Sequence, residues 1–134
     1  MKMNIQSQSG YVTLLTVLIV SAVGVAIGSS LLLLGLGSSR SSLSQQQSKQ
    51  AGALADACVE EALQQLRFST SYSGTATLSF GTSSCTYLVT VLSGENRNIE
   101  STGTVGAVVR RVEVDVSQLT PKIVVSSWQE VAGL

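Results

Sequence analysis

The feature that most constrains this chain is an apolar stretch near its N-terminus. Residues 11–36 contain no charged side chain and include the consecutive leucines at positions 31–34. As an α-helix with a rise of roughly 1.5 Å per residue, the stretch would be about 39 Å long, which exceeds the ~30 Å hydrocarbon core of a bilayer. Such a segment is therefore a secretory signal, a membrane anchor, or a surface that packs against other copies of the chain.

The length of the stretch favours a retained membrane span over a signal peptide. A secretory signal has an apolar region of about 7–15 residues that ends at a cleavage site with small side chains. The small residues at 26–28 form the one site that fits, and cleavage there would leave the leucine run near the new N-terminus. We expect residues 11–36 to form a transmembrane helix, with a cleaved signal as the alternative.

The charges that flank the span say little about its orientation. Lys2 precedes the span, whereas Arg40 and Lys49 follow it, and such a balance sets no clear direction. The polar N-terminus is too short to form a domain, and a pair of cysteines suits an oxidising compartment. We therefore expect a single-pass protein of the cytoplasmic membrane with its C-terminal domain outside.

Small side chains recur along one side of the predicted span. Ser21, Gly24 and Gly28 follow one another at steps of three and four residues, which places them on one face of a helix. Strips of this kind let helices approach closely in lipid, so these residues are candidates for helix packing. The alternative is that glycine is simply common in membrane-spanning helices.

The segment after the span predicts an amphipathic helix. Residues 37–67 are rich in Ser and Gln and contain no proline. Its apolar and amide side chains recur mostly at steps of three or four residues, the spacing of one helical face: Leu43, Gln47, Gln50, Leu54, Cys58, Ala62 and Leu66. Arg67 stands where a cation suits the C-terminal end of the helix dipole. We expect a nearly continuous helix from the membrane to about Arg67.

The rest of the chain, residues 68–134, predicts short antiparallel strands. We expect strands at 76–80 and 85–93, a turn at 94–98, two strands within 99–116 with a glycine turn near Gly103 or Gly106, and a further strand after Pro121. The second of these strands places four side chains on one face, namely Cys85, Tyr87, Val89 and Val91.

One of these strands has an alternating pattern that indicates a sheet with a single buried face. Its apolar side chains are Val112, Val114 and Val116, and they alternate with the charged side chains of Arg111, Glu113 and Asp115. The predicted fold class is therefore α+β, a long N-terminal helix packed on a small antiparallel sheet.

The two cysteines fall on the apolar faces of the predicted helix and sheet. A bond between Cys58 and Cys85 would join the helix to the sheet, and in the chain-entropy model a loop of about 27 residues contributes about 3 kcal/mol to stability. The alternative is two separate buried thiols. A zinc site is not expected, because two cysteines without any histidine do not complete a tetrahedral ligand set.

The side chains that enzymes use are scarce. The chain has no histidine, and we find no phosphate-binding glycine loop or nucleophile elbow. Glu60 and Glu61 are adjacent on a helix, so they point in different directions and indicate a solvated edge. The oxygen-rich turn at 94–98 lacks the carboxylate spacing of a calcium loop. We therefore expect neither an enzyme nor a metal site.

The charge of the chain does not indicate nucleic-acid binding. The net charge is zero and the basic residues are scattered, so nucleic-acid binding is not expected.

The chain has one tryptophan, Trp128. We predict that it is buried under the last strand, with a surface anchor for a partner as the alternative.

The order of these segments resembles that of type IV pilins and pseudopilins. The residues that carry the resemblance are Ser9 and Gly10 directly before Tyr11, the apolar run that begins there, and the later helix QAGALADACVEEALQQLR. That helix is similar to the alanine-rich helix of minor pilins of the PilX-like type. The resemblance covers residues 1–67, whereas the sheet matches only in kind.

The resemblance implies processing of the N-terminus. Residues 1–10 would be a leader peptide, a prepilin peptidase would cut between Gly10 and Tyr11, and Tyr11 would become N-methylated. The family usually has Phe as the first mature residue and Glu as the fifth, where this chain has Leu15. A carboxylate in the bilayer costs roughly 2.5–3.5 kcal/mol on insertion scales and is kept for function. Its replacement by Leu15 favours a minor, tip-located subunit or a divergent system over a major subunit.

The role that the resemblance implies is structural. The chain would be a minor pilin or pseudopilin, assembled through its N-terminal helix into a type IV pilus-like filament at the cell surface. Its partners would be other pilin-like subunits, the prepilin peptidase, membrane lipid before assembly and, indirectly, an assembly platform protein and ATPase. The alternative is a monomeric, membrane-anchored extracellular binding domain. Neither role requires a cofactor.

Overall fold

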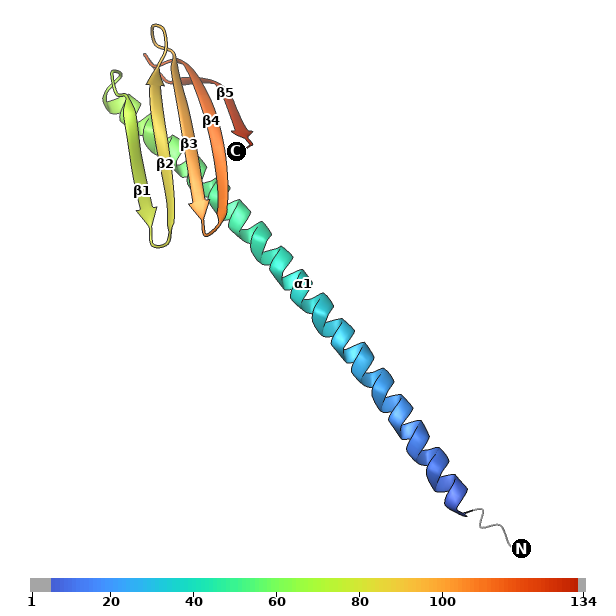
Figure 1. Cartoon of the computed structure of the whole chain (residues 1–134). Coiled ribbons are helices and arrows are strands. Elements are labelled where there is room, and N and C mark those ends of the chain that lie inside the picture. The colour runs from blue at the N-terminus through green and yellow to red at the C-terminus, as the bar shows by residue number, and fades with distance from the viewer. Residues whose placement is uncertain (1–5, 133–134) are drawn as a thin grey trace, which may run out of the picture. The chain divides into compact units, whose positions relative to one another are not determined.

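The first element of the chain is one long helix, and five strands follow it. The structure, a computed structural model, describes residues 6–132. The elements are α1 (Gln6–Phe68), β1 (Gly74–Phe80), β2 (Ser83–Val91), β3 (Arg97–Val105), β4 (Val108–Gln118) and β5 (Val124–Val131) (Figure 1). The predicted α+β class is confirmed, and α1 ends one residue beyond the predicted Arg67.

The chain divides into two units along α1. The first unit, Met1–Ser42, contains the apolar part of the helix. The second unit, Leu43–Leu134, contains the C-terminal part of α1 together with the whole sheet. The second unit therefore has its own hydrophobic core, whereas the described part of the first unit is a single helix.

The sheet is a simple antiparallel meander. Its strand order β1-β2-β3-β4-β5 follows the chain, so each strand pairs with its sequence neighbours and β1 and β5 form the two edges (Figure 1). The connection between β3 and β4 turns at Gly106, whose φ is 59°, a left-handed conformation that glycine adopts without strain. Of the two glycines predicted for this turn, Gly106 makes it, and Gly103 lies inside β3.

One face of the sheet packs against the C-terminal part of α1. The predicted alternation in β4 is confirmed, because Val112, Val114 and Val116 are buried between partly exposed charged residues. The helix contributes mostly small side chains to the same core, namely Ala51, Ala55, Cys58, Val59, Ala62 and Leu66. Two predicted apolar faces are wrong in part, because Leu43 and Gln50 of α1 and Val91 of β2 are exposed. Leu43 lies at the start of the second unit and Val91 at the end of β2, whereas Gln50 is exposed because the buried side of α1 begins at Ala51.

The helix approaches the sheet most closely over β3. A Cβ atom built on Gly103 would lie 2.0 Å from the carbonyl oxygen of Ala51. Two residues earlier on the same face, the buried hydroxyl of Ser101 donates a hydrogen bond of 2.7 Å to the carbonyl oxygen of Ala55. Small residues on both elements therefore bring backbone against backbone, and little space is left there for any side chain.

A disulfide joins the helix to the sheet beside this contact. Cys58 of α1 and Cys85 of β2 are bonded, with their Cα atoms 6.1 Å apart, and both are buried. Cys85 is the register partner of Gly103 in the β2–β3 pair. The covalent link and the closest helix–sheet contact are therefore neighbours.

Three loops at one end of the sheet are held together by two charged side chains. Arg97, only 7% exposed, donates to the carbonyl oxygens of Gly94 and Asn96 in the β2–β3 turn and to that of Thr70 after α1. Glu95 accepts hydrogen bonds from the backbone N–H of Leu119 and from the hydroxyl of Thr120 in the β4–β5 loop. The turn at 94–98 is thus a structural clasp.

The clasp predicts an acid-dependent loss of stability. The hydrogen bonds from Thr120 and then from Leu119 lower the pKa of the Glu95 carboxyl below its ordinary value of 4.5. A carboxyl whose pKa is lower in the folded state stabilises the fold above its unfolded pKa, and this contribution is lost as the pH falls through the folded pKa. Glu95→Gln should therefore be less stable than wild type at neutral pH, by a margin that shrinks below about pH 4.5.

Denaturant midpoints at pH 7 and pH 3 measure this margin. The control is Glu100→Gln on the exposed sheet face. The Glu100 side chain makes no hydrogen bond within the described residues 6–132 and lies opposite Glu113 in the β3–β4 pair, so its neutralisation should not destabilise the fold at pH 7. A Glu95→Gln margin that is the same at both pH values would contradict the assignment.

Candidate functional site in the N-terminal helix

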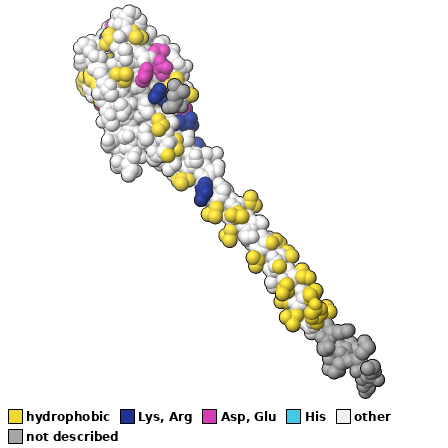
Figure 2. Space-filling model, in the orientation of Figure 1, with side chains coloured by type: hydrophobic (Ala, Val, Ile, Leu, Met, Phe, Trp, Pro, Cys, Tyr) yellow, Lys and Arg dark blue, Asp and Glu magenta, His cyan; other side chains and the backbone are white. Residues whose placement is uncertain are grey.

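Within the first unit, the stretch of α1 over residues 11–36 is apolar on every side. Its large apolar side chains are exposed at successive positions, among them Val12, Leu14, Val17, Leu18, Ile19 and Val20, and later Leu31 to Leu34. None of the most apolar 18-residue window of α1 is buried. Figure 2 shows apolar side chains (yellow) along the visible face of this segment. A helix that is apolar all round requires lipid or protein around it.

The Ser and Thr hydroxyl groups of residues 11–36 are satisfied inside the helix itself. Each Thr and Ser hydroxyl between residues 11 and 36 donates to a backbone carbonyl three or four residues earlier, at 2.7–3.0 Å. A hydroxyl left without a partner in hydrocarbon would cost several kcal/mol. With these bonds made, the Ser and Thr side chains of residues 11–36 present no unmet donor to an apolar environment.

By length and composition, α1 is long and apolar enough to cross a bilayer. The first charged residue after the apolar stretch is Arg40. Helices of this kind serve as membrane anchors or as signal sequences. The disulfide of the second unit is consistent with a domain outside the cytoplasm, because disulfides persist in oxidising compartments.

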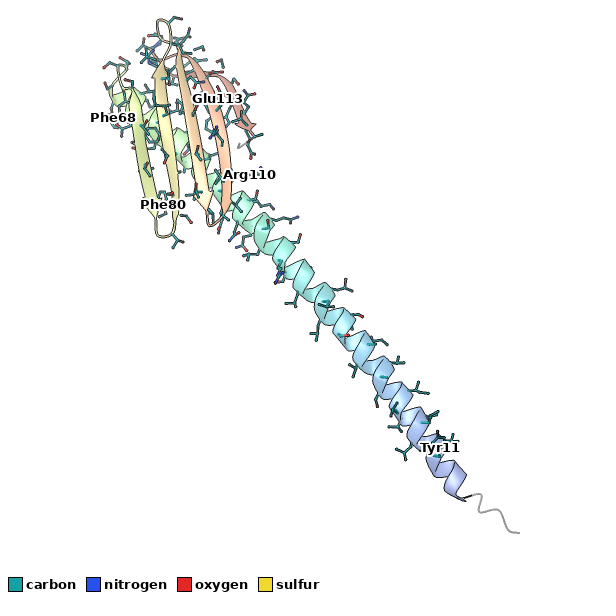
Figure 3. The ribbon with its side chains drawn as sticks, in the orientation of Figure 1. Tyr11, Phe68, Phe80, Arg110 and Glu113 are labelled. Carbon is teal, nitrogen blue, oxygen red and sulfur yellow. A yellow bond between two sulfur atoms is a disulfide. The ribbon has the colours of Figure 1, made fainter. Side chains whose placement is uncertain are left out.

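The predicted processing site lies within the helix. Since α1 begins at Gln6, both Gly10 and Tyr11 are helical, and the Tyr11 side chain is 68% exposed (Figure 3). The start of the predicted leader, residues 1–5, lies outside the described residues. Leu15, at the position where the pilin family has Glu, is an exposed apolar side chain like its neighbours.

The predicted packing residues share one open face of the first unit. A Cβ atom built on Gly24 or Gly28 would meet no other atom within 4 Å. The Ser21 hydroxyl turns toward the carbonyl oxygen of Val17 at 2.7 Å, so this side chain is also compact. The face is thus flat enough for the close approach of another helix, but no contact within the described residues covers it.

In the second unit, the structure corrects the prediction that Trp128 is buried. Trp128 is 44% exposed instead of buried, because it lies on the edge strand β5, and its indole N–H donates to Asp56 of α1 at 3.2 Å. Within residues 6–132, no three His, Cys, Asp or Glu side chains come together as a metal site. Glu61 accepts a hydrogen bond from Gln65 on the same helix.

Comparison of the chain with protein-family models, with curated proteins and with solved structures found no match. The architecture is nevertheless pilin-like. It combines a long apolar N-terminal helix with an antiparallel sheet packed on the helix's later turns and a disulfide between the two.

Proposed function

We propose that this protein is a structural subunit of a type IV pilus-like filament, a minor pilin or pseudopilin. The observation that carries the proposal is the stretch of α1 over residues 11–36, which is apolar on all sides and has its Ser and Thr hydroxyls bonded internally. Such a helix is stable in a bilayer before assembly and among like helices afterwards. The role is structural and involves no catalysis by this chain.

The second unit supplies the part of the subunit that would lie outside the membrane. Its compact core and disulfide suit a domain that leaves the cytoplasm. A prepilin peptidase would remove residues 1–10 and leave Tyr11 as the N-methylated first residue. An assembly platform and ATPase would then insert the subunit. Leu15 in place of Glu supports a minor or tip-located role, because the assembly device of the major subunits is missing.

The proposal predicts a defined mature N-terminus. When the chain is expressed with a prepilin peptidase, the intact mass should fall by that of residues 1–10 and rise by one methyl group. Gly10→Ile should block the change, because it places a branched side chain at the cleaved bond. Gly37→Ile is the matched control, since it makes the same substitution beyond the apolar stretch and should leave processing intact. An unprocessed wild-type chain would overturn the proposal in favour of a monomeric membrane-anchored binding domain.

Cross-linking tests assembly separately from processing. Both native cysteines are in the disulfide and no free cysteine remains in residues 6–132, so one introduced thiol reports on one position. Gly24→Cys should form cross-linked dimers in membranes. Ala26→Cys should not, because two residues correspond to a rotation of about 200° around a helix. Equal cross-linking at both positions would argue against packing through this face.

A further inference from the structure

A groove lined by an exposed tryptophan and by polar side chains lies between α1 and the edge strand β5. One hollow of about 320 Å³ is lined by Trp128, Leu63, Glu60, Gln64 and Arg67. A second hollow of about 420 Å³ follows, lined by Arg67 again and by residues of the β4–β5 loop that include Lys122. Because Arg67 lines both hollows, we treat them as one groove, here called the β5 groove.

The aromatic side of the β5 groove is a fixed and exposed ring. Trp128 is 44% exposed, although a large apolar ring gains stability from burial. Its orientation is set by the hydrogen bond from Nε1 to Asp56 Oδ1. The ring is therefore held open beside the hollow and keeps a flat apolar face available for a ligand.

The polar groups around the ring are free to bind. Glu60, Gln64 and Arg67 make no hydrogen bond or ion pair within the described residues 6–132. Together they offer a carboxylate that accepts hydrogen bonds, an amide that both donates and accepts them, and a guanidinium that donates them. A ligand with neighbouring hydroxyl groups matches this set, because each hydroxyl both donates and accepts a hydrogen bond.

Two cations line the second hollow, and the Glu95 carboxylate holds two other lining residues, Leu119 and Thr120, through hydrogen bonds. Arg67 and Lys122 both line it, and neither is paired with a carboxylate in the part of the chain that the structure describes. The ion pair that is present, Arg110 with Glu130 at 2.7 Å, lies outside the residues that line this hollow. An anionic group placed between Arg67 and Lys122, away from Glu95, would meet two cations without displacing an internal partner.

We propose that the β5 groove binds an anionic oligosaccharide built of pyranose rings. A pyranose has one apolar C–H face, which stacks on Trp128, and a rim of hydroxyls, which bond to Glu60 and Gln64. A carboxylate on the adjoining ring points toward Arg67 and Lys122. Both hollows fall at the small end of ligand pockets, which span about 300–1,000 Å³, a size suited to one or two rings. The inference does not depend on filament assembly.

The single tryptophan makes the test direct. The full chain, held in a phosphocholine detergent without a sugar headgroup, is titrated with tetragalacturonate while the fluorescence of Trp128 is followed. The proposal predicts a saturable change. The methyl ester of the same oligosaccharide should bind roughly fivefold more weakly, because it loses attraction to two exposed cations. Added salt should reduce this difference.

Variants, measured by calorimetric titration, locate the site. Trp128→Leu should weaken binding about tenfold or more, and Gln64→Ala, an exposed change that leaves the core intact, should also weaken it. Lys122→Gln should remove the preference for the acid over the ester. Phe80→Leu is the matched control, because Phe80 is an exposed aromatic residue at the end of β1 (Figure 3), the opposite edge of the sheet.

Three results would overturn the proposal. The first is the absence of saturable binding. The second is that Trp128→Leu and Gln64→Ala bind as tightly as wild type and the control Phe80→Leu do. The third is an equal affinity for tetraglutamate, an acidic peptide without rings.

Discussion

Replacing Gly103 with alanine should destabilise the second unit by about 3 kcal/mol, near the upper end for overpacking. The added Cβ would lie 2.0 Å from the Ala51 carbonyl oxygen and 2.8 Å from the Ala55 nitrogen. Both are backbone atoms of a helix, so neither can rotate away as a side chain would. The helix must therefore move off β3, which also strains the buried hydrogen bond from Ser101 to Ala55.

The measurement is denaturant unfolding of the full chain in detergent, followed by the fluorescence of Trp128. Gly52→Ala is the matched control, because it makes the same substitution on the facing helix and its Cβ meets no atom within 4 Å. Alanine is favoured over glycine in a helix by roughly 0.8–1 kcal/mol, so this control should stabilise the unit. Equal midpoints for Gly103→Ala and wild type would mean that α1 does not approach β3 so closely.

The fold class was predictable because it depends on local periodicity. The alternation of Val112, Val114 and Val116 with charged residues specifies a half-buried strand whatever lies above it. The repeated step of four residues from Leu54 to Leu66 likewise specifies one helical face. Each pattern identified which side of its element is buried, and the pairing of the two faces followed.

The roles of the two glycines could not be predicted, because they differ only in tertiary context. Gly106 has a positive φ in a turn, and Gly103 sits in an ordinary strand conformation under a helix. Either residue suits a turn by composition. What distinguishes them is the backbone of Ala51, more than fifty residues earlier in the chain, and no local pattern records this contact.

The environment of Trp128 escaped prediction for a related reason. The pairing of β4 with β5 shifts in register around Val116, so a simple alternation does not tell which β5 residues are covered. The strand also lies at the sheet edge, where α1 covers the ring only in part. The β5 groove is thus a product of strand order and register, neither of which composition reveals.

The sequence predicts that the apolar stretch of the first unit needs an apolar environment. It does not predict whether lipid or another helix supplies that environment. The absence of charge from residues 11–36 requires an apolar environment, and the internal bonds of the hydroxyls show how the segment meets that requirement. Lipid and like helices both satisfy it. The choice between them depends on other chains, which is why processing and cross-linking decide the function.

Removing the disulfide should lower the stability of the second unit by about 3–4 kcal/mol in the chain-entropy model. The bond closes a loop with a sequence separation of 27 between Cys58 and Cys85, and it ties helix to sheet beside Gly103. The variant Cys58→Ala/Cys85→Ala tests this expectation, because alanine removes the link without burying a polar group in place of either sulfur atom. Denaturant midpoints of the oxidised wild type and of the double variant give the difference.

Reduction of the wild type supplies an independent comparison. Both sulfur atoms are buried, so a reductant reaches them only when the unit opens, and the bond should survive mild reduction under native conditions. Wild type that is reduced in denaturant and then refolded should have the same free energy of unfolding as the double variant, to within about 1 kcal/mol, since both lack the link. A double variant as stable as the oxidised protein would mean that packing of α1 on β3, and not the covalent link, holds the helix in place.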